Sequence, residues 1–251
     1  MTESATPTIS IITATYNAAE HLPRLIESLV AQTDQEFEWV VADGGSTDGT
    51  LELLEKAKSQ LRNVVIDSRP DFGIYDALNK AVRLASGEYY LVSGADDELD
   101  QTAIENFKIL ASRTGADILT AAVAIMNGRY VVRRPSGASW FHGGMAYVTG
   151  HAIGSVFRKS LHNQKSIGYY SKAYPIAADQ LFIKRAVQSG ASIAVGNFLA
   201  GRFGDTGVSS VNLAGTLSEF FCVQLETERL KGLQVALYIL RIIKNYPKLL
   251  R

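Results

Sequence analysis

Residues 38–50 read EWVVADGGSTDGT, a run of mostly apolar residues that turns abruptly into Asp, Gly, Ser and Thr. The first part belongs to a β-branched and aromatic segment, residues 37–42, which predicts a buried strand. The second part is rich in residues that favour turns and helix caps. A helical apolar pattern follows over residues 47–59, and Asp48 is expected to accept backbone N–H groups at the start of that helix.

The same alternation of strand and helix extends over the first hundred residues. Further strands are predicted at 8–14, 63–67 and 88–92, and further helices at 21–32 and 74–85. This order is typical of an α/β fold with a Rossmann-like, mostly parallel sheet flanked by helices. Such sheets bind ligands at the carboxyl ends of their strands, and the polar segments of this chain stand at those ends: Thr13–Asn17, Asp43–Asp48, Asp67–Gly73 and Ser93–Asp97.

The pattern changes after residue 115. Asp117–Met126 and Arg129–Arg133 are predicted to be strands joined by a turn at Asn127 and Gly128. Helices are predicted at 176–189 and, as one long helix with Gly232 inside it, at 216–243. We therefore expect a domain of residues 1–215, with a nucleotide-binding half (1–100) and a second half (101–215), and an amphipathic basic C-terminal helix over 216–251.

The composition gives no reason to expect a nucleic-acid partner. The chain has 251 residues, and its 25 Lys and Arg balance its 25 Asp and Glu, so nothing demands a nucleic-acid partner. Residues 229–251 nevertheless carry six basic residues and no acidic one, which favours contact with an anionic surface. Cys222 is the only cysteine, which is typical of a reducing compartment. The N-terminal residues resemble no secretory signal, so a cytoplasmic location is expected.

Carboxylates at the strand ends suggest the chemistry. The chain has neither a GxxxxGK[ST] phosphate loop nor a GxGxxG dinucleotide fingerprint. Asp43 follows the second strand instead, and Asp96 and Asp97 follow the fourth. Adjacent carboxylates repel each other unless a cation lies between them, and Mg²⁺ or Mn²⁺ suits both carboxylate and diphosphate oxygens. We therefore expect one of these ions as a cofactor.

Several motifs, in order, resemble the family-2 glycosyltransferases of the GT-A fold. They are TATYNAAEHLPRLIESLVAQ, EWVVADGGSTDGT, RPDFGIYDALNKAVRLASGEYYLVSGADD and AADQLF, and together they cover roughly residues 8–210. GIYDALNKA is similar to the subgroup that builds bacterial capsule, exopolysaccharide and O-antigen chains. The resemblance implies a GT-A-type sheet and an inverting, metal-dependent transferase that uses nucleotide sugars, with residues 101–215 as its acceptor-binding half. One departure is GADD, where the family often has N-[AS]-DD.

The resemblance also implies roles for individual residues. An aspartate that matches Asp43 contacts the nucleotide base, and residues that match Thr13, Thr15 and Tyr16 line the same pocket. Asp97 matches the metal ligand and Asp96 its sugar- or ribose-facing neighbour. Asp179 matches the catalytic aspartate, and His151 a histidine near the acceptor. Arg69 and Asp71, in the loop after the third strand, and Asn79, on the helix that follows, are candidates for donor contact.

Structural alternatives stay open for each candidate. Asp179 could be only a helix N-cap, His151 only a structural hydrogen-bonding residue, and Asn79 part of a solvated helix face. Asp205, between Gly204 and Gly207, could belong to a lid over the donor or to a simple turn. The tail helix could pack in the protein or form an oligomer, or it could lie on the anionic inner leaflet of a membrane.

The favoured function is therefore an inverting glycosyltransferase of bacterial surface polysaccharide synthesis. It would move a sugar from a nucleotide diphosphate, preferably UDP, to a hydroxyl of a lipid-linked glycan. A sugar-1-phosphate nucleotidyltransferase shares this strand-end chemistry but usually carries a glycine-rich basic loop after the first strand, where this chain has TATYNAAEHLPR. An inactive nucleotide-sugar-binding or scaffold protein is the remaining alternative. Convergence of Asp97 and Asp179 on one cleft would favour an enzyme.

Overall fold

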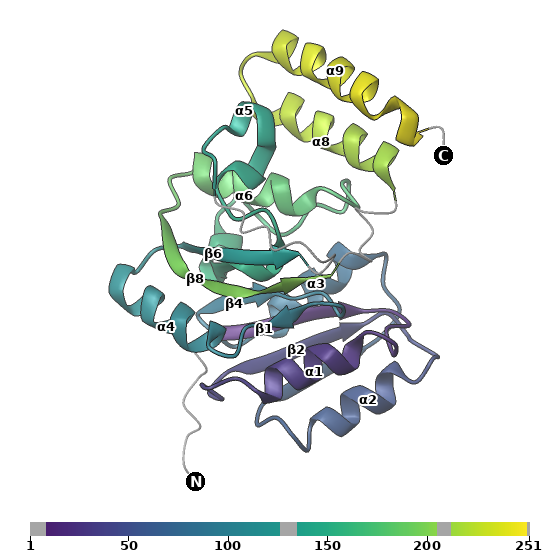
Figure 1. The fold of residues 1–251 in the computed structure, drawn as a ribbon, viewed down its shortest axis with the longest axis vertical. Helices are drawn as coiled ribbons and strands as arrows, with labels where there is room; N and C mark the ends of the chain where they lie inside the picture. Colours follow the sequence, from purple (N-terminus) through teal and green to yellow (C-terminus); the bar gives the residue numbers. More distant parts are fainter. Residues whose placement is uncertain (1–8, 126–134, 205–211, 250–251) are drawn as a thin grey trace.

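The computed structural model describes residues 9–125, 135–204 and 212–249. These residues form one eight-stranded sheet in the order β3-β2-β1-β4-β7-β6-β8-β5. The strands β1 to β4 pair in parallel, and so do β6 and β8. β7 runs antiparallel between β4 and β6, and β5 antiparallel to β8. The sheet is mixed but mostly parallel and is flanked by helices, which confirms the predicted fold class (Figure 1).

The first half follows the predicted order of strands and helices. Its elements are β1 (Ile9–Thr15), α1 (Leu22–Val30), β2 (Glu38–Asp43), α2 (Thr50–Ala57), β3 (Val64–Ser68), α3 (Ile74–Leu84) and β4 (Tyr89–Val92). Helices cover both faces of this part of the sheet, which explains why β2 is buried at every position. Trp39 and Val41 pack in the core that contains α1 and α2, whereas Val40 and Ala42 pack in the core that contains α3.

The second half contains more elements than the sequence predicted. They are β5 (Glu98–Leu99), α4 (Ala103–Thr114), β6 (Ile118–Ile125), α5 (Ser139–His142), β7 (Ser155–Arg158), α6 (Ala178–Gln188), β8 (Ile193–Phe203), α8 (Leu213–Thr227) and α9 (Lys231–Leu249). The predicted strand 117–126 and helix 176–189 are confirmed as β6 and α6. The predicted hairpin partner Arg129–Arg133, with its turn at Asn127 and Gly128, lies outside the described residues.

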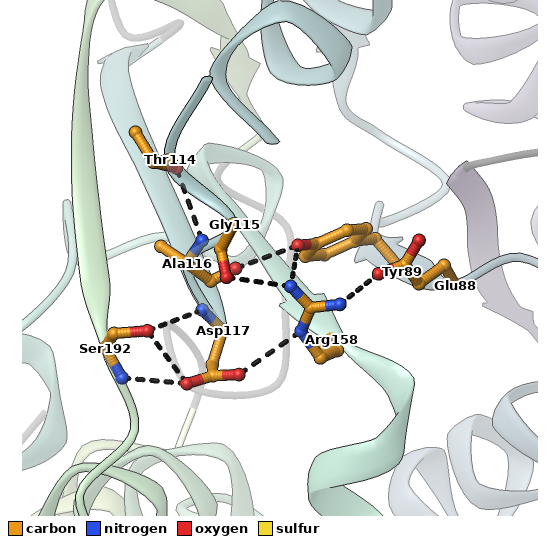
Figure 2. Close-up of polar contacts among 8 residues, drawn as sticks. All are labelled: Glu88, Tyr89, Thr114, Gly115, Ala116, Asp117, Arg158 and Ser192. Carbon is orange, nitrogen blue, oxygen red and sulfur yellow. Dashed lines mark hydrogen bonds and ion pairs between the residues drawn. The ribbon is translucent and has the colours of Figure 1, made fainter. Parts of the chain in front are cut away.

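A polar cluster fastens the two halves together at the amino ends of β4, β6 and β8 (Figure 2). Arg158, at the end of the antiparallel β7, donates hydrogen bonds to Asp117 Oδ1 (3.2 Å) and to the carbonyl oxygen of Gly115 (2.8 Å). It also forms an ion pair with Glu88. Asp117 Oδ2 in turn accepts bonds from the N–H (2.9 Å) and the hydroxyl (2.8 Å) of Ser192. This edge of the sheet is thereby closed, and the opposite, carboxyl edge is left for a ligand.

The prediction of one helix over residues 216–243 is wrong. The chain leaves the helical conformation at Glu228 and starts again at Lys231, so that α9 folds back beside α8 (Figure 1). A buried charge accounts for the break. Lys184 of α6 has a fully buried side chain, and its ammonium lies 2.6 Å from a carboxylate oxygen of Glu228. Gly232 lies in the first turn of α9, away from the break.

The C-terminal helices pack on the domain body. Lys184 also donates to Gln224 Oε1 (2.6 Å) on α8, and Arg185 of α6 pairs with Glu226 (2.6 Å). Buried as well as exposed polar contacts thus join α8 to α6. The domain boundary expected at residue 215 stays a prediction. In the described part of the chain, no helix has both the length and the apolar character needed to span a bilayer.

We predict that Glu228→Ala lowers the free energy of unfolding by about 3 kcal/mol, because it leaves the buried Lys184 ammonium without its carboxylate. Glu226→Ala is the matched control on the same helix. It breaks a half-exposed pair with Arg185 and should cost about 1 kcal/mol or less. Urea unfolding of the two variants measures the difference. Equal losses would show that the pair with Lys184 does not hold the helix break.

Candidate active site

A cleft of about 530 Å³ opens at the carboxyl edge of the sheet. Its wall comes from the ends of β1 and β4, the start of α3, the segment 145–155, the first turns of α6 and the end of β8. Five of the residues predicted from the sequence line it: Tyr16, Asp96, Asp97, His151 and Asp179. Segments more than eighty residues apart in sequence therefore bring the carboxylates expected for donor and acceptor together in one space.

Asp97 is the most enclosed of these carboxylates. It is 1% exposed, and it accepts the N–H of Gly204 on Oδ1 (2.9 Å) and the N–H of Gly94 on Oδ2 (2.8 Å). Burial raises the pKa of Asp97 to about 7, and the negative charge of Asp96 adds to this rise. Gly204 is required by space, since a Cβ there would lie 2.2 Å from Asp96 Oδ2 and 2.7 Å from the Asp96 carbonyl oxygen, and a Cβ on Gly94 would crowd Asp96 Oδ1 at 2.9 Å.

The donor set suits a metal ion that is shared with a ligand. Among the residues that the structure describes, no group of three or more His, Cys, Asp or Glu side chains could hold a metal ion. Two adjacent carboxylates are nevertheless what Mg²⁺ commonly takes from a protein when phosphate oxygens and water complete its octahedron. Each oxygen of Asp97 accepts one N–H and keeps a second lone pair. Asp97, with the charge of Asp96 beside it, therefore fits Mg²⁺ or Mn²⁺ bound together with a diphosphate.

Asp43 anchors the loop that follows β2. It is 1% exposed, and its two oxygens accept bonds from the hydroxyls of Thr15, Ser46 and Ser68 and from the N–H groups of Gly45 and Ser46. Burial would raise the pKa of Asp43, but these hydrogen bonds outweigh it and hold the pKa below its ordinary value. Asp43 and Thr15 therefore shape the loop, and neither side chain lines the cleft.

The second aspartate of the opening stretch anchors the same loop from its other end. Asp48 Oδ1 accepts the N–H (3.1 Å) and the hydroxyl (2.6 Å) of Thr50, the first residue of α2. It serves the start of the helix, as predicted, although Gly49 occupies the N-cap position. Asp48 Oδ2 also accepts the N–H of Ala19, in the loop after β1. The two aspartates thus bind the loop after β2 to itself and to the loop after β1.

Two predicted donor residues lie in the framework of the protein. Thr13 is fully buried and accepts the indole N–H of Trp39 at 3.0 Å, so the expectation that it lines the pocket is wrong. Asn79 is 2% exposed, which rules out a solvated helix face. Its amide donates to the carbonyl oxygen of Tyr170 (2.9 Å) and accepts the Tyr170 N–H (3.0 Å). Asn79 therefore holds Tyr170, which does line the cleft.

The loop after β3 lies close to Tyr16, which lines the cleft. Arg69 makes two hydrogen bonds to Asp67 (2.7 and 2.6 Å) on the exposed surface. Asp71 Oδ1 accepts the N–H of Gly73, while its Oδ2 would lie 2.8 Å from a Cβ on Gly44. The Tyr16 ring would lie 3.3 Å from the same Cβ, so Asp71 and Tyr16 are both close to Gly44, directly after β2. Asp205 and Gly207 lie outside the described residues.

Asp179 lies in the first turn of α6, and two residues that the sequence did not indicate surround it. The Tyr75 hydroxyl lies 2.9 Å from both Asp179 Oδ1 and the carbonyl oxygen of Ile176. Ala177, at the N-cap, has no side chain that could cap the helix. Glu219 of α8 does so instead, because one of its oxygens accepts the N–H groups of Ile176 (2.8 Å) and Ala177 (2.9 Å). Burial raises the pKa of Asp179, and the Glu219 charge raises it further.

A buried aromatic network forms the wall between β4 and α6. The Tyr90 hydroxyl lies 2.9 Å from that of Tyr170 and 2.7 Å from His162 Nε2, and His162 Nδ1 lies 3.0 Å from the carbonyl oxygen of Gly168. Burial lowers the pKa of His162 to about 4, so the ring is neutral at physiological pH. His151, the histidine singled out in the sequence, lines the cleft and packs against Phe203 with 4.1 Å between ring centroids.

Comparison with known proteins assigns the family. The model of glycosyl transferase family 2 matches residues 10–169, more than half of the chain. The chain therefore belongs to glycosyl transferase family 2.

The relatives found by sequence similarity match only a part of the chain. A PGL/p-HBAD biosynthesis glycosyltransferase of Mycobacterium bovis is 44% identical over 96 residues, which are 38% of this chain and 38% of that protein. A chondroitin synthase of Pasteurella multocida is 37% identical over 99 residues, which are 39% of this chain and 10% of that protein. The matches thus span well under half of these relatives.

Solved structures with the same fold cover almost the whole chain. S. aureus TarS (1–349) in complex with UDP-GlcNAc has a TM-score of 0.71 at 21% identity, over 92% of this chain and 70% of that one. A mannosyltransferase from Pyrobaculum calidifontis in complex with GDP-Man and Mn²⁺ has a TM-score of 0.69 at 18% identity, over 92% and 68%. At these identities the likeness establishes the fold alone, which is that of the expected GT-A type.

We predict that Glu219→Gln lowers the pKa of Asp179. Burial is the main cause of the raised value, and the variant leaves it unchanged, but it removes the like charge that adds to it. Glutamine keeps an oxygen that can accept the N–H groups of Ile176 and Ala177. The ¹³C carboxyl shift of Asp179, assigned by its absence in Asp179→Asn, reports the titration. Glu226→Gln, on the same helix, should leave the curve unchanged, and identical curves for Glu219→Gln and wild type would refute the coupling.

Proposed function

We propose that the protein is an inverting glycosyltransferase that moves a sugar from a nucleotide diphosphate, preferably UDP, to an acceptor hydroxyl. The observation that carries the proposal is that Asp97 and Asp179 line one cleft. A transferase needs a place for the diphosphate and a base on the acceptor side, and the two carboxylates supply one each. A scaffold protein has no need for this convergence.

The donor is assigned to the β4 side of the cleft. Asp97 would hold Mg²⁺ or Mn²⁺ together with the diphosphate, and Asp96 would contact the ribose or the sugar. When bound, such an ion neutralises the diphosphate charge and so favours its departure as a leaving group. The nucleotide base, uracil in the case of UDP, would lie near Tyr16 and Asp71. These residues belong to the loops that Asp43 and Thr15 hold in place. Arg69 and Asn79 are assigned indirect parts, since their polar groups are engaged with Asp67 and Tyr170.

Asp179 is assigned the role of general base. Inversion requires a group that removes the acceptor proton as the new bond forms, from within hydrogen-bond reach of the attacking oxygen. The raised pKa makes the Asp179 carboxylate a stronger base than an exposed aspartate, while Tyr75 fixes the position of Oδ1. His151, on the wall of the same cleft, is assigned to the acceptor side.

The loop after β1 argues against a nucleotidyltransferase. In that class we expect free backbone N–H groups after the first strand, where they bind phosphate. Here three such N–H groups donate to side chains between the end of β2 and the start of α2, at 2.8 to 3.0 Å. Asn17 donates to Ser46, Ala18 to Thr50 and Ala19 to Asp48. They are therefore occupied, and the glycosyltransferase remains the better explanation of the cleft.

The acceptor is proposed to be a lipid-linked glycan of bacterial surface polysaccharide synthesis, at the inner face of the cytoplasmic membrane. The support is the sequence similarity of GIYDALNKA to that subgroup and the basic segment 229–251. Similarity to a mycobacterial glycosyltransferase and to a chondroitin synthase fits a glycan or glycolipid acceptor.

We predict that Mn²⁺-supported UDP binding weakens as the pH falls. A metal ligand must be ionised, and the pKa of Asp97 is about 7, so roughly one tenth of the free protein is ionised there at pH 6 and nine tenths at pH 8. The dissociation constant for UDP at fixed free Mn²⁺ should rise by about 10-fold between pH 8 and pH 6. Titration calorimetry measures it, and equal affinity at both pH values would contradict the role of Asp97.

Asp97→Asn is the matching variant, and it should abolish the Mn²⁺-dependent part of UDP binding. The variant can accept only one of the N–H groups of Gly94 and Gly204, so it should also be less stable than wild type. Its unfolding must therefore be measured beside its affinity. Asp100→Asn, three residues along the chain, is the control and should bind UDP like wild type.

We predict that Asp179→Asn leaves UDP affinity near wild type and lowers turnover by roughly 100-fold or more. Its side chain can still accept the bonds from Tyr75 and Gln180, so the first turn of α6 should keep its shape. Steady-state rates with the nucleotide sugar selected by a thermal-shift screen measure the effect. Asp34→Asn, which removes a carboxylate paired with Lys108, is the control. Turnover at half the wild-type rate, with chemistry limiting, would transfer the role to His151.

A further inference from the structure

The helix α9 carries its apolar side chains outward. Val235, Ile239, Leu240, Ile243 and Tyr246 are each more than 40% exposed, and Ile243 reaches 64%. A helix on the surface of a globular protein normally turns its apolar stripe toward the core and its polar residues toward water. A row of five large exposed side chains on one helix is the kind of surface that other molecules cover.

Polar contacts hold the side of α9 that faces the protein, beside the Tyr238 ring, which stacks on Phe221 of α8 with 4.3 Å between ring centroids. Gln234 is fully buried, and its amide donates to the carbonyl oxygen of Trp140 at 3.0 Å. Arg241 donates to the carbonyl oxygen of Phe141 at 2.6 Å, and its guanidinium also lies over the Phe220 ring. These bonds fix the rotation of the helix about its own axis. The outward direction of the apolar face is therefore set by specific contacts.

The apolar surface continues beyond α9. Leu230 and Leu233 border a groove that also exposes Trp140 of α5, and Leu230 is 68% exposed. Figure 1 places α8 and α9 at one end of the molecule, on the far side from α1 and α2. The outer face of α9 and this groove together form a broad apolar surface at that end.

Apart from Glu228, which borders the groove and is paired with Lys184, the charges around this surface are basic. Arg229, Lys231, Lys244 and Lys248 are exposed, and residues 229–249 contain no Asp or Glu. Two copies that met through this face would bring like charges together, which disfavours a symmetric dimer. An apolar face with a basic margin instead complements a bilayer that contains anionic lipid, where apolar side chains enter the interface and lysines meet the headgroups.

We propose that the outer face of α9, defined by Val235, Ile239, Leu240, Ile243 and Tyr246, docks the protein on an anionic lipid surface with the helix axis parallel to it. The docking places α6 and α8 on the membrane side of the molecule, and α6 carries Asp179 in its first turn. A lipid-linked acceptor would then enter the cleft from the side on which the base is located. The docking itself is independent of the enzymatic assignment.

The test is flotation of the full chain with vesicles of phosphatidylcholine containing 40% phosphatidylglycerol, and with phosphatidylcholine alone, at about 0.1 and 0.5 M NaCl. Substitution is preferable to truncation, because a chain ending at Leu225 would also lose Glu228, the partner of buried Lys184. The variant is Ile239→Glu with Ile243→Glu. Its matched control is Ile109→Glu, which changes an isoleucine of α4 that is 41% exposed.

We expect wild type and the control to float with the anionic vesicles, and to float less at high salt, whereas the double variant stays at the bottom of the gradient. A second variant, Lys244→Glu with Lys248→Glu, should lose the preference for anionic over neutral vesicles. The proposal is overturned if the double variant floats like wild type, or if wild type floats with neither vesicle. It is equally overturned if wild type is a dimer by light scattering and the double variant a monomer, since a second copy would then cover the face.

Discussion

The carboxylate of Asp97 joins the two halves of the molecule. One oxygen accepts the N–H of Gly94, two residues after β4, and the other accepts the N–H of Gly204, directly after β8. A buried carboxylate must be satisfied by donors, so the bonds that hold Asp97 also fix the loop after β4 against the end of β8. The shape of the cleft depends on this junction. The raised pKa of Asp97 follows from the same burial and makes its ionisation responsive to a bound cation.

Carboxylates organise the rest of the carboxyl edge in the same manner. Asp43 gathers five donors from the last residues of β1 and β3 and from the loop after β2, and Glu219 reaches from α8 to cap the helix that bears Asp179. At the amino edge, Arg158 performs the corresponding task with carboxylate and carbonyl acceptors (Figure 2). A cation thus organises the amino edge of the sheet, and carboxylates organise the carboxyl edge, where the cleft lies. The family to which the chain belongs agrees with this arrangement.

The sequence predicted the first hundred residues well because both helices and strands there bury continuous apolar patterns. It missed β5, which has two residues, and β8, whose side chains are mostly half-buried and show no clear alternation. It joined α8 and α9 because the apolar spacing continues through the break, whereas the break depends on the contact of Glu228 with Lys184, 44 positions away. Asp96 and Asp97 could be located from the end of a strand, and Asp179 from the resemblance to the family. Tyr75 and Glu219 could not, because their partners near Asp179 are set only by the packing of α3 and α8 on α6.

The central claim is that the metal-bound donor and the general base Asp179 occupy one cleft. Paramagnetic relaxation by Mn²⁺ tests this claim most directly. With UDP bound, the unpaired electrons of Mn²⁺ broaden nearby nuclei, so the ¹³C carboxyl signals of labelled aspartates report their distance from the ion. We expect the signals of Asp96 and Asp97 to vanish and that of Asp179 to broaden, while that of Asp34, paired with Lys108 outside the cleft, stays sharp. An Asp179 signal as sharp as that of Asp34, in protein saturated with UDP and Mn²⁺, would contradict the shared site.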